Sequence, residues 1–192
     1  KMGEMVPQDE LYIVMKLCDA FDLVMLEKGF SDSTKAKLSK KPYFTEAEIA
    51  KIKEGFDAAD IEKKLSEGAE PLHFNGKVVG CVKAATDKNL TAHIMAENIV
   101  VKASAVIALK NLVYRNNIPA DSIEYVIECS EEACGDMNQR GGGNFAKAIA
   151  EVAGLVSATG SDTRGFCAAP THSLINAAAL VKSGVYKSVA IV

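Results

Sequence analysis

A cysteine among small residues is the first position in this sequence that could do chemistry. Cys167 lies in residues 163–172, TRGFCAAPTH, between a short strand-like segment and an apolar helical run. Backbone amides at a helix start are unsatisfied and the helix dipole is positive there, so a thiolate is stabilised and can carry an acyl group as a thioester. The same amides could hold an oxyanion. The alternative is a buried structural cysteine, which is the usual state of a free thiol.

A glycine-rich segment, residues 134–144 (CGDMNQRGGGN), is the second unusual feature. Consecutive glycines before a helix allow a ligand to approach the backbone closely, and the helix start can bind an anion. The spacing matches neither a P-loop nor a dinucleotide fingerprint. The alternative is a tight surface turn that ends in a helix cap. The substrate-binding residues predicted here are Arg140, Gly141, Gly142, Gly143 and Asn144.

Acidic residues follow the strand-like segment IEYVIECS, residues 123–130. Ligands of open α/β sheets bind at the carboxyl ends of the strands, and Glu128, Glu131 and Glu132 lie at such an end. Glu131 is the predicted general base, against the alternative of an exposed loop acid. His172, five residues after Cys167, is a third candidate catalytic residue that could contact the thiolate. Otherwise it lies on a helix surface.

The elements that must position these residues alternate between strand and helix from about residue 75 onward. This order predicts βαβ units, a mostly parallel sheet and an α/β fold. The predicted strands lie in residues 76–85, 123–130, 157–167 and 186–192, and the predicted helices in 93–116, 145–155 and 171–184.

The first seventy residues show a helical pattern instead. Apolar residues recur at helical spacing across residues 7–30, with Asp9 a possible cap after Pro7, and Thr45 and Glu48 form a capping-box pattern. We therefore expect a helical appendage over residues 1–72 and an α/β domain over residues 73–192.

Composition excludes several classes of function. The chain has 192 residues, a net charge of −3 and 24% charged residues of mixed sign, so we expect no nucleic-acid or membrane partner. No apolar run is expected to reach the roughly 18 residues of a spanning helix. Five cysteines at irregular spacing and three scattered histidines predict a reduced, cytoplasmic protein without a metal site. The opening lysine and the closing strand-like YKSVAIV suggest a piece of a longer polypeptide.

Residues 166–192, FCAAPTHSLINAAALVKSGVYKSVAIV, resemble the nucleophile segment of the thiolase superfamily, in particular of ketoacyl synthase III. The resemblance covers roughly residues 100–192. It implies one half of a layered thiolase-like fold with Cys167 at the position of the acylated cysteine. The histidine and asparagine that complete the oxyanion hole in that superfamily would lie in an absent C-terminal half.

A more specific resemblance runs over nearly the whole chain. The segments IECSEEACGDMNQRGGGNFAKAIAE, ATGSDTRGFCAAPTH, MVPQDELY and GKVVGCVK are similar to those of component C beta subunits of glycine/sarcosine/betaine reductase complexes. This resemblance implies a cytoplasmic enzyme of amino-acid fermentation, without a cofactor of its own. A selenoprotein A would supply a selenium-bound carboxymethyl group, which would become an acetyl thioester and leave as acetyl phosphate. An alpha subunit would complete a hetero-oligomer, and its own thiol is an alternative carrier of the acetyl group.

Two other functions compete with this interpretation. One is a ketoacyl-synthase-like acyltransferase, which the segment GDMNQRGGGN disfavours because ordinary synthases lack it at this position. The other is a non-catalytic scaffold that holds the alpha subunit and docks the selenoprotein. An unreactive Cys167 would favour the scaffold.

Overall fold

The computed structural model describes residues 4–130 and 144–192 of the chain. Within these ranges the protein is a mixed α/β structure with two small sheets, as predicted for the fold class. Contacts divide the chain into two compact units, one of residues 5–103 and one of residues 1–4 and 104–192. The dividing point lies inside the long helix α5 (Ala92–Arg115). The predicted boundary between residues 72 and 73 stays a prediction, and the contacts group the residues differently.

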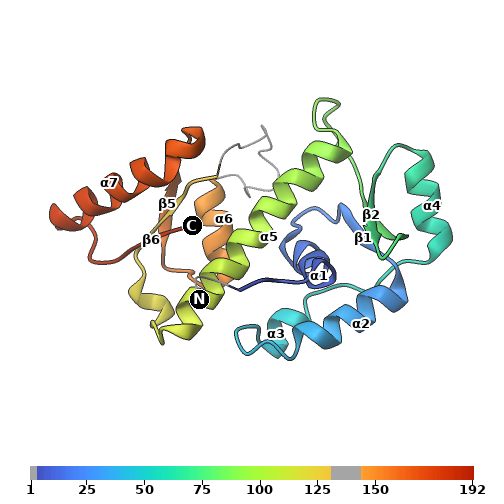
Figure 1. Ribbon diagram of the computed structural model, residues 1–192, viewed down its shortest axis with the longest axis horizontal. Coiled ribbons are helices and arrows are strands. Elements are labelled where there is room, and N and C mark those ends of the chain that lie inside the picture. The colour runs from blue at the N-terminus through green and yellow to red at the C-terminus, as the bar shows by residue number, and fades with distance from the viewer. Residues whose placement is uncertain (1–3, 131–143) are drawn as a thin grey trace. The chain divides into compact units, whose positions relative to one another are not determined.

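The unit of residues 5–103 contains an antiparallel sheet of strand order β1-β3-β2, which Figure 1 shows beside helices α1 to α4. Its strands are β1 (Val24–Leu26), β2 (Glu70–Phe74) and β3 (Lys77–Val82). Its helices are α1 (Gln8–Cys18), α2 (Lys28–Leu38), α3 (Glu46–Ile49) and α4 (Ala58–Ser66).

The expectation that the first seventy residues are helical is wrong at β1. Helix α1 ends at Cys18, and residues 24–26 pair with β3 as a fully buried strand. Three consecutive apolar residues can belong to a buried strand or to a buried helix, and periodicity does not separate the two. The antiparallel pairing with β3 is what decides between them here.

The caps of two helices were predicted, one correctly. Thr45 and Glu48 form the reciprocal capping box at the start of α3. The predicted cap at Asp9 is wrong, because Pro7 is the cap residue of α1 and makes no side-chain cap hydrogen bond. Asp9 lies inside the helix, is 3% exposed and forms an ion pair with Lys37 of α2. Its carboxylate therefore joins α1 to α2.

The second unit is built on a parallel sheet of strand order β5-β4-β6. Its strands are β4 (Tyr125–Glu128), β5 (Thr159–Asp162) and β6 (Val189–Ile191). Its helices after α5 are α6 (Phe145–Ala153) and α7 (Ala169–Lys182), with the 3-10 turns η1 (Ala120–Ser122) and η2 (Phe166–Ala168). The predicted alternation of strands and helices and the parallel sheet are confirmed from β4 onward. The strand predicted at residues 76–85 is wrongly placed, because it is β3 of the antiparallel sheet and does not belong to the parallel one.

The order of the strands sets where the connections reverse direction. From β4 the chain passes through α6 to β5 on one side, and from β5 it passes through α7 to β6 on the other side of β4. Helix α6 packs on β4 and β5, whereas α7 packs on β6 and β4, and Figure 1 shows the strands between the two helices. This reversal is the feature next to which open α/β sheets bind ligands, at the carboxyl ends of their strands.

Helix α5 is apolar and long enough to cross a membrane by length and composition, with a mean hydropathy of 1.4 over its most apolar 18 residues. The expectation that no segment reaches this length is therefore wrong. Half of that window is buried within the protein. The helix also carries the buried polar side chains of Asn98, Lys102 and Lys110. Burial of this kind is typical of the core helix of a soluble protein, since polar side chains in a span are rare.

Candidate functional site

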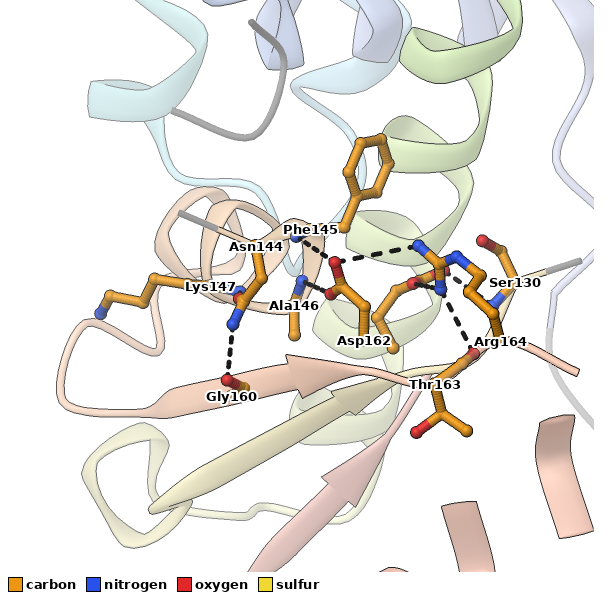
Figure 2. A network of polar contacts seen from close by, with 10 residues as sticks. Ser130, Asn144, Phe145, Ala146, Lys147, Gly160, Asp162, Thr163 and Arg164 are labelled. Atoms are coloured by element: carbon orange, nitrogen blue, oxygen red, sulfur yellow. Dashed lines mark hydrogen bonds and ion pairs between the residues drawn. The ribbon is translucent and has the colours of Figure 1, made fainter. Parts of the chain in front are cut away.

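The carboxyl edge of the parallel sheet brings together charged side chains from two neighbouring strands. Glu128 ends β4 and Asp162 ends β5, and the two residues are direct partners in the sheet register. Arg164 follows two residues after Asp162, and its Nη1 donates to Oε2 of Glu128. Figure 2 shows the guanidinium of Arg164 beside Asp162, and Nη2 of Arg164 lies 3.8 Å from Oδ2 of Asp162.

Glu128 is the most buried member of this cluster, with its side chain only 2% exposed. Its second oxygen accepts a hydrogen bond of 2.8 Å from the backbone N–H of Ser130. A buried carboxylate is costly unless it is paired and hydrogen-bonded, and Glu128 has both kinds of partner. The pair fixes the point where the chain leaves β4.

Asp162 organises the start of α6. Its two oxygens accept hydrogen bonds of 3.0 and 2.9 Å from the backbone N–H groups of Phe145 and Ala146. These are among the amides that a helix leaves unsatisfied at its first turn, and a negative charge there is favourable. Asp162 therefore ties the end of β5 to the beginning of α6.

The backbones of β4 and β5 and the helix α6 approach one another closely at Gly160. Gly160 of β5 faces Val126 of β4, and a Cβ at this glycine would lie 2.4 Å from the Val126 carbonyl oxygen and 2.8 Å from Cβ of Ala146. No larger residue fits there without displacing the sheet or α6. The missing side chain lets α6 pack directly on β5.

Cys167 lies beyond β5 on the turn η2 and is exposed. The residue before it, Phe166, has a left-handed backbone with φ of 50° and a side chain 66% exposed. A left-handed conformation costs about 1–2 kcal/mol for a residue with a Cβ. The turn closes with a hydrogen bond of 3.0 Å from Ala168 N–H to Gly165 O, and α7 begins at Ala169. The thiol therefore lies directly before a helix start, as predicted, and it is exposed rather than the buried structural cysteine of the alternative.

His172 is exposed on the first turns of α7, which is the alternative state given for it. Its ring lies against the turn before the cysteine, since a Cβ on Gly165 would be 3.6 Å from Cδ2 of His172. The structure thus places His172 beside the segment that carries Cys167. Its catalytic role stays a prediction.

Asn144 is the one predicted substrate-binding residue within the described ranges, and its amide serves the fold. Its Oδ1 accepts from Lys147 N–H at 2.8 Å, which caps α6, and its Nδ2 donates to Gly160 O at 2.6 Å. The other predicted residues of this loop lie outside the described residues: Glu131, Arg140, Gly141, Gly142 and Gly143.

Arg164 is the member of the cluster that the sequence analysis missed. The signal for it was available, because an acid that ends one parallel strand and a base just after its neighbour meet at the same edge of the sheet. Within residues 4–130 and 144–192, no group of three or more His, Cys, Asp and Glu side chains is placed to hold a metal ion.

Comparison with known proteins identifies a homologue. No family model and no solved structure matches the chain. The chain is 59% identical over its whole length to the glycine/sarcosine/betaine reductase complex component C subunit beta of Peptoclostridium acidaminophilum, and it spans 38% of that protein's length. The resemblance inferred from the sequence is confirmed: this chain is homologous, from its first residue to its last, to part of a component C beta subunit of a glycine/sarcosine/betaine reductase complex.

Proposed function

We propose that this chain is part of the acetyl-phosphate-forming component of a glycine reductase complex and that Cys167 carries the acetyl group as a thioester. The observation that carries the proposal is the exposed thiol at the carboxyl edge of a parallel sheet, on a turn that leads into a helix. The 59% identity to a component C beta subunit supports the assignment to such a complex.

The chemistry asked of Cys167 is acyl transfer. The thiolate is acylated at sulfur, and a phosphate oxygen then attacks the carbonyl carbon of the thioester. The carbon–sulfur bond breaks, the thiolate leaves and acetyl phosphate is released. The oxyanion would have to be stabilised by other amides of this segment than those of Ala168 and Ala169, whose N–H groups already donate to the carbonyl oxygens of Gly165 and Phe166. His172 is the candidate base, because its ring lies against Gly165.

The remaining partners follow from the same proposal. A selenoprotein A supplies the carboxymethyl group on selenium. Its carbon–selenium bond breaks, a second thiol bonds to selenium and so provides the two electrons that turn CH2 into CH3, and a carboxylate oxygen leaves as hydroxide when the Cys167 sulfur bonds to the carbonyl carbon. An alpha subunit completes the component, and phosphate is the acceptor. The complex works in the cytoplasm as a hetero-oligomer, and no cofactor beyond these groups is included in the proposal. The thiolase-like fold is part of the proposal as well, with the parallel sheet and α7 as the segment of that fold that bears the nucleophile.

The test is site-resolved alkylation of the full-length subunit by iodoacetamide across a range of pH, read by peptide mass spectrometry. We expect Cys167 to react fastest and a pre-incubated acetyl donor to protect it. Cys18 and Cys81 are matched controls because both are buried, and burial also raises the pKa of the Cys81 thiol. Cys167 reacting no faster than these two would contradict the proposal.

A second measurement assigns the base. If His172 activates the thiol, the variant H172Q lowers the rate of Cys167 alkylation near neutral pH severalfold in the pH–rate profile. Asn176→Ala, at another exposed position of α7, is the matched control and leaves the profile unchanged. An unchanged profile in H172Q would remove His172 from the mechanism.

A scaffold function is the second candidate, and one observation favours it. Phe166, Leu174 and Ile175 expose between 62% and 66% of their surface around the turn and α7. Apolar side chains exposed together are typical of surfaces that other proteins cover. A Cys167→Ser variant that keeps full activity in the reconstituted complex would support the scaffold over the acyl carrier.

A further inference from the structure

The ion pair between Glu128 and Arg164 joins two parts of the chain that are 36 residues apart. It joins the exit of β4 to the segment between β5 and Cys167. A second connection runs alongside it, because the backbone N–H of Thr163 donates to the Glu128 carbonyl oxygen at 2.7 Å. One residue of β4 therefore holds two consecutive residues of the segment that leads to the thiol.

The charges of the cluster decide against an anion-binding site. Glu128 and Asp162 bring two negative charges and Arg164 brings one positive charge. Nε and Nη2 of Arg164 are buried and have no hydrogen-bond partner among the described residues, but Nη2 lies 3.8 Å from a carboxylate oxygen of Asp162. An incoming anion would face that carboxylate at close range in a partly dry site. The arrangement suits a guanidinium that holds chain segments in place.

The segment that begins with Arg164 leads into the turn η2, where Phe166 has a strained backbone conformation. Between Arg164 and Cys167 lie only Gly165 and Phe166, whose left-handed φ of 50° is unfavourable without support from its surroundings. The guanidinium of Arg164 is held on two sides, by the hydrogen bond from its Nη1 to Glu128 and by the Asp162 carboxylate 3.8 Å from its Nη2, so it restrains the segment that carries it. The support is applied just before the turn.

We propose that the Glu128–Arg164 ion pair is a positioning pair for Cys167, which fixes the turn so that the thiol meets acyl donors in a reactive geometry. The inference rests on the proposed function, since it assigns a role in acyl transfer to Cys167. Arg164 and Glu128 act through the turn and do not themselves take part in bond making.

Acyl transfer to Cys167 can be measured with acetyl phosphate as the probe, in the reverse of the proposed reaction. The thiolate attacks the carbonyl carbon, the carbon–oxygen bond to phosphate breaks, phosphate leaves and an acetyl thioester forms. This reaction depends on orientation, and misplacement by about 1 Å can cost on the order of 100-fold in rate. Alkylation by iodoacetamide uses the same thiol but needs no acyl-donor geometry, so the two reactions separate positioning from thiol reactivity.

The experiment compares variants of the full-length subunit in the intact complex, with labelled acetyl phosphate and peptide mass spectrometry at Cys167. We expect R164M to lower the acetylation rate about tenfold or more while alkylation changes less than about threefold. R164K, which keeps the charge but loses the fork, should recover part of the rate. E128Q alone removes the same ion pair as R164M. The double variant E128Q/R164M should therefore acetylate Cys167 no more slowly than the slower of E128Q and R164M.

Lys37→Met is the matched control, because it breaks another ion pair to a buried carboxylate, that of Asp9. It should leave acetylation at Cys167 unchanged. Wild-type acetylation in R164M, with the protein folded by circular dichroism, overturns the positioning role. The positioning role is also overturned if acetylation and alkylation fall together in R164M, R164K and K37M, in proportion to the stability that each variant loses. If wild-type Cys167 takes up no acetyl group at all, the proposed function fails and the positioning role fails with it.

Discussion

The pKa of Lys16 depends on the burial of its side chain and on the charges around it. Its Nζ donates to the Glu54 carbonyl oxygen at 3.0 Å and lies 4.7 Å from the centre of the Phe56 ring. Burial lowers the pKa of Lys16 to about 8, repulsion from Lys35 and Lys53 adds to this effect, and Asp22 and Asp19 oppose it. The folded protein therefore binds this proton less tightly than the unfolded chain, in which a lysine has a pKa near 10.4.

This difference predicts a pH-dependent stability. Between about pH 8 and pH 10 the unfolded chain holds more protons, so the free energy of unfolding should rise with pH across this window. Lys16→Met removes the ionisation, and its stability gain over the wild type should be largest near pH 7 and shrink toward pH 10. The side chain is partly exposed, so the effect is reduced by solvent screening.

Urea unfolding of the wild type and K16M across this pH range measures the effect. Lys51→Met, at an exposed position of the same unit, is the matched control for loss of a surface charge. A stability difference between K16M and wild type that stays constant from pH 7 to pH 10 would show that burial does not depress this pKa.

At the scale of elements, the contact between β5 and α6 depends on one missing side chain. Gly160→Ala should lower the free energy of unfolding by about 2 kcal/mol or more, because the added methyl group overlaps both a neighbouring carbonyl and Ala146. Gly165→Ala is a matched control in the same unit. Its Cβ would find its nearest neighbours at 3.5–3.7 Å, which is ordinary packing.

Denaturant titrations of G160A and G165A give the comparison directly. We expect the unfolding midpoint of G160A to fall well below that of the wild type and that of G165A to stay close to it. Equal midpoints for the two variants would mean that β5 and α6 can move apart at little cost.

The elements that sequence analysis predicted well share a physical cause. The strands and helices from residue 123 onward alternate with clear turns, and their local patterns agree with the parallel sheet that they form. The hairpin of β2 and β3 was half missed, although Asn75 and Gly76 have φ values of 50° and 76°, as a two-residue I′ turn requires. That dipeptide between two apolar runs was a usable signal. Strand β1 was not predictable, since its three residues form a strand only through pairing with β3.

The candidate site also combines a feature that local sequence predicts with one that depends on the tertiary structure. The position of Cys167 before a helix follows from local pattern and was predicted, whereas its exposure is seen only in the structure. The Glu128–Arg164 pair depends on strand register, which brings residues 36 positions apart to one edge. The sequence could place an acid and a base at the same edge of the sheet, but which residues pair there depends on the register of the assembled sheet.

At the scale of the whole molecule, α7 exposes apolar surface that soluble proteins usually cover. Leu174, Ile175, Val181 and Val185 are between 45% and 63% exposed on or just after this helix. We expect the 192-residue chain to bind a hydrophobic dye such as ANS and to self-associate. The double variant L174S/I175S should weaken both effects and change the free energy of unfolding by less than about 0.5 kcal/mol per site.

Dye fluorescence and light scattering at several protein concentrations are the measurements, and Ala178→Ser, exposed on the same helix, is the matched control. If L174S/I175S binds as much dye as the wild type, the apolar surface of α7 is not what the dye recognises.

The two compact units share one uninterrupted helix, and this limits how the chain can be divided. The boundary at residues 103 and 104 lies near the middle of α5. Cutting at that point would leave two short half-helices, each below the length at which an isolated helix is stable in water. A cut before or after α5 would leave the whole helix with one unit, although half of its residues belong to the other. The two units therefore cannot be exchanged as separate modules, by protein engineering or by recombination, without rebuilding this helix.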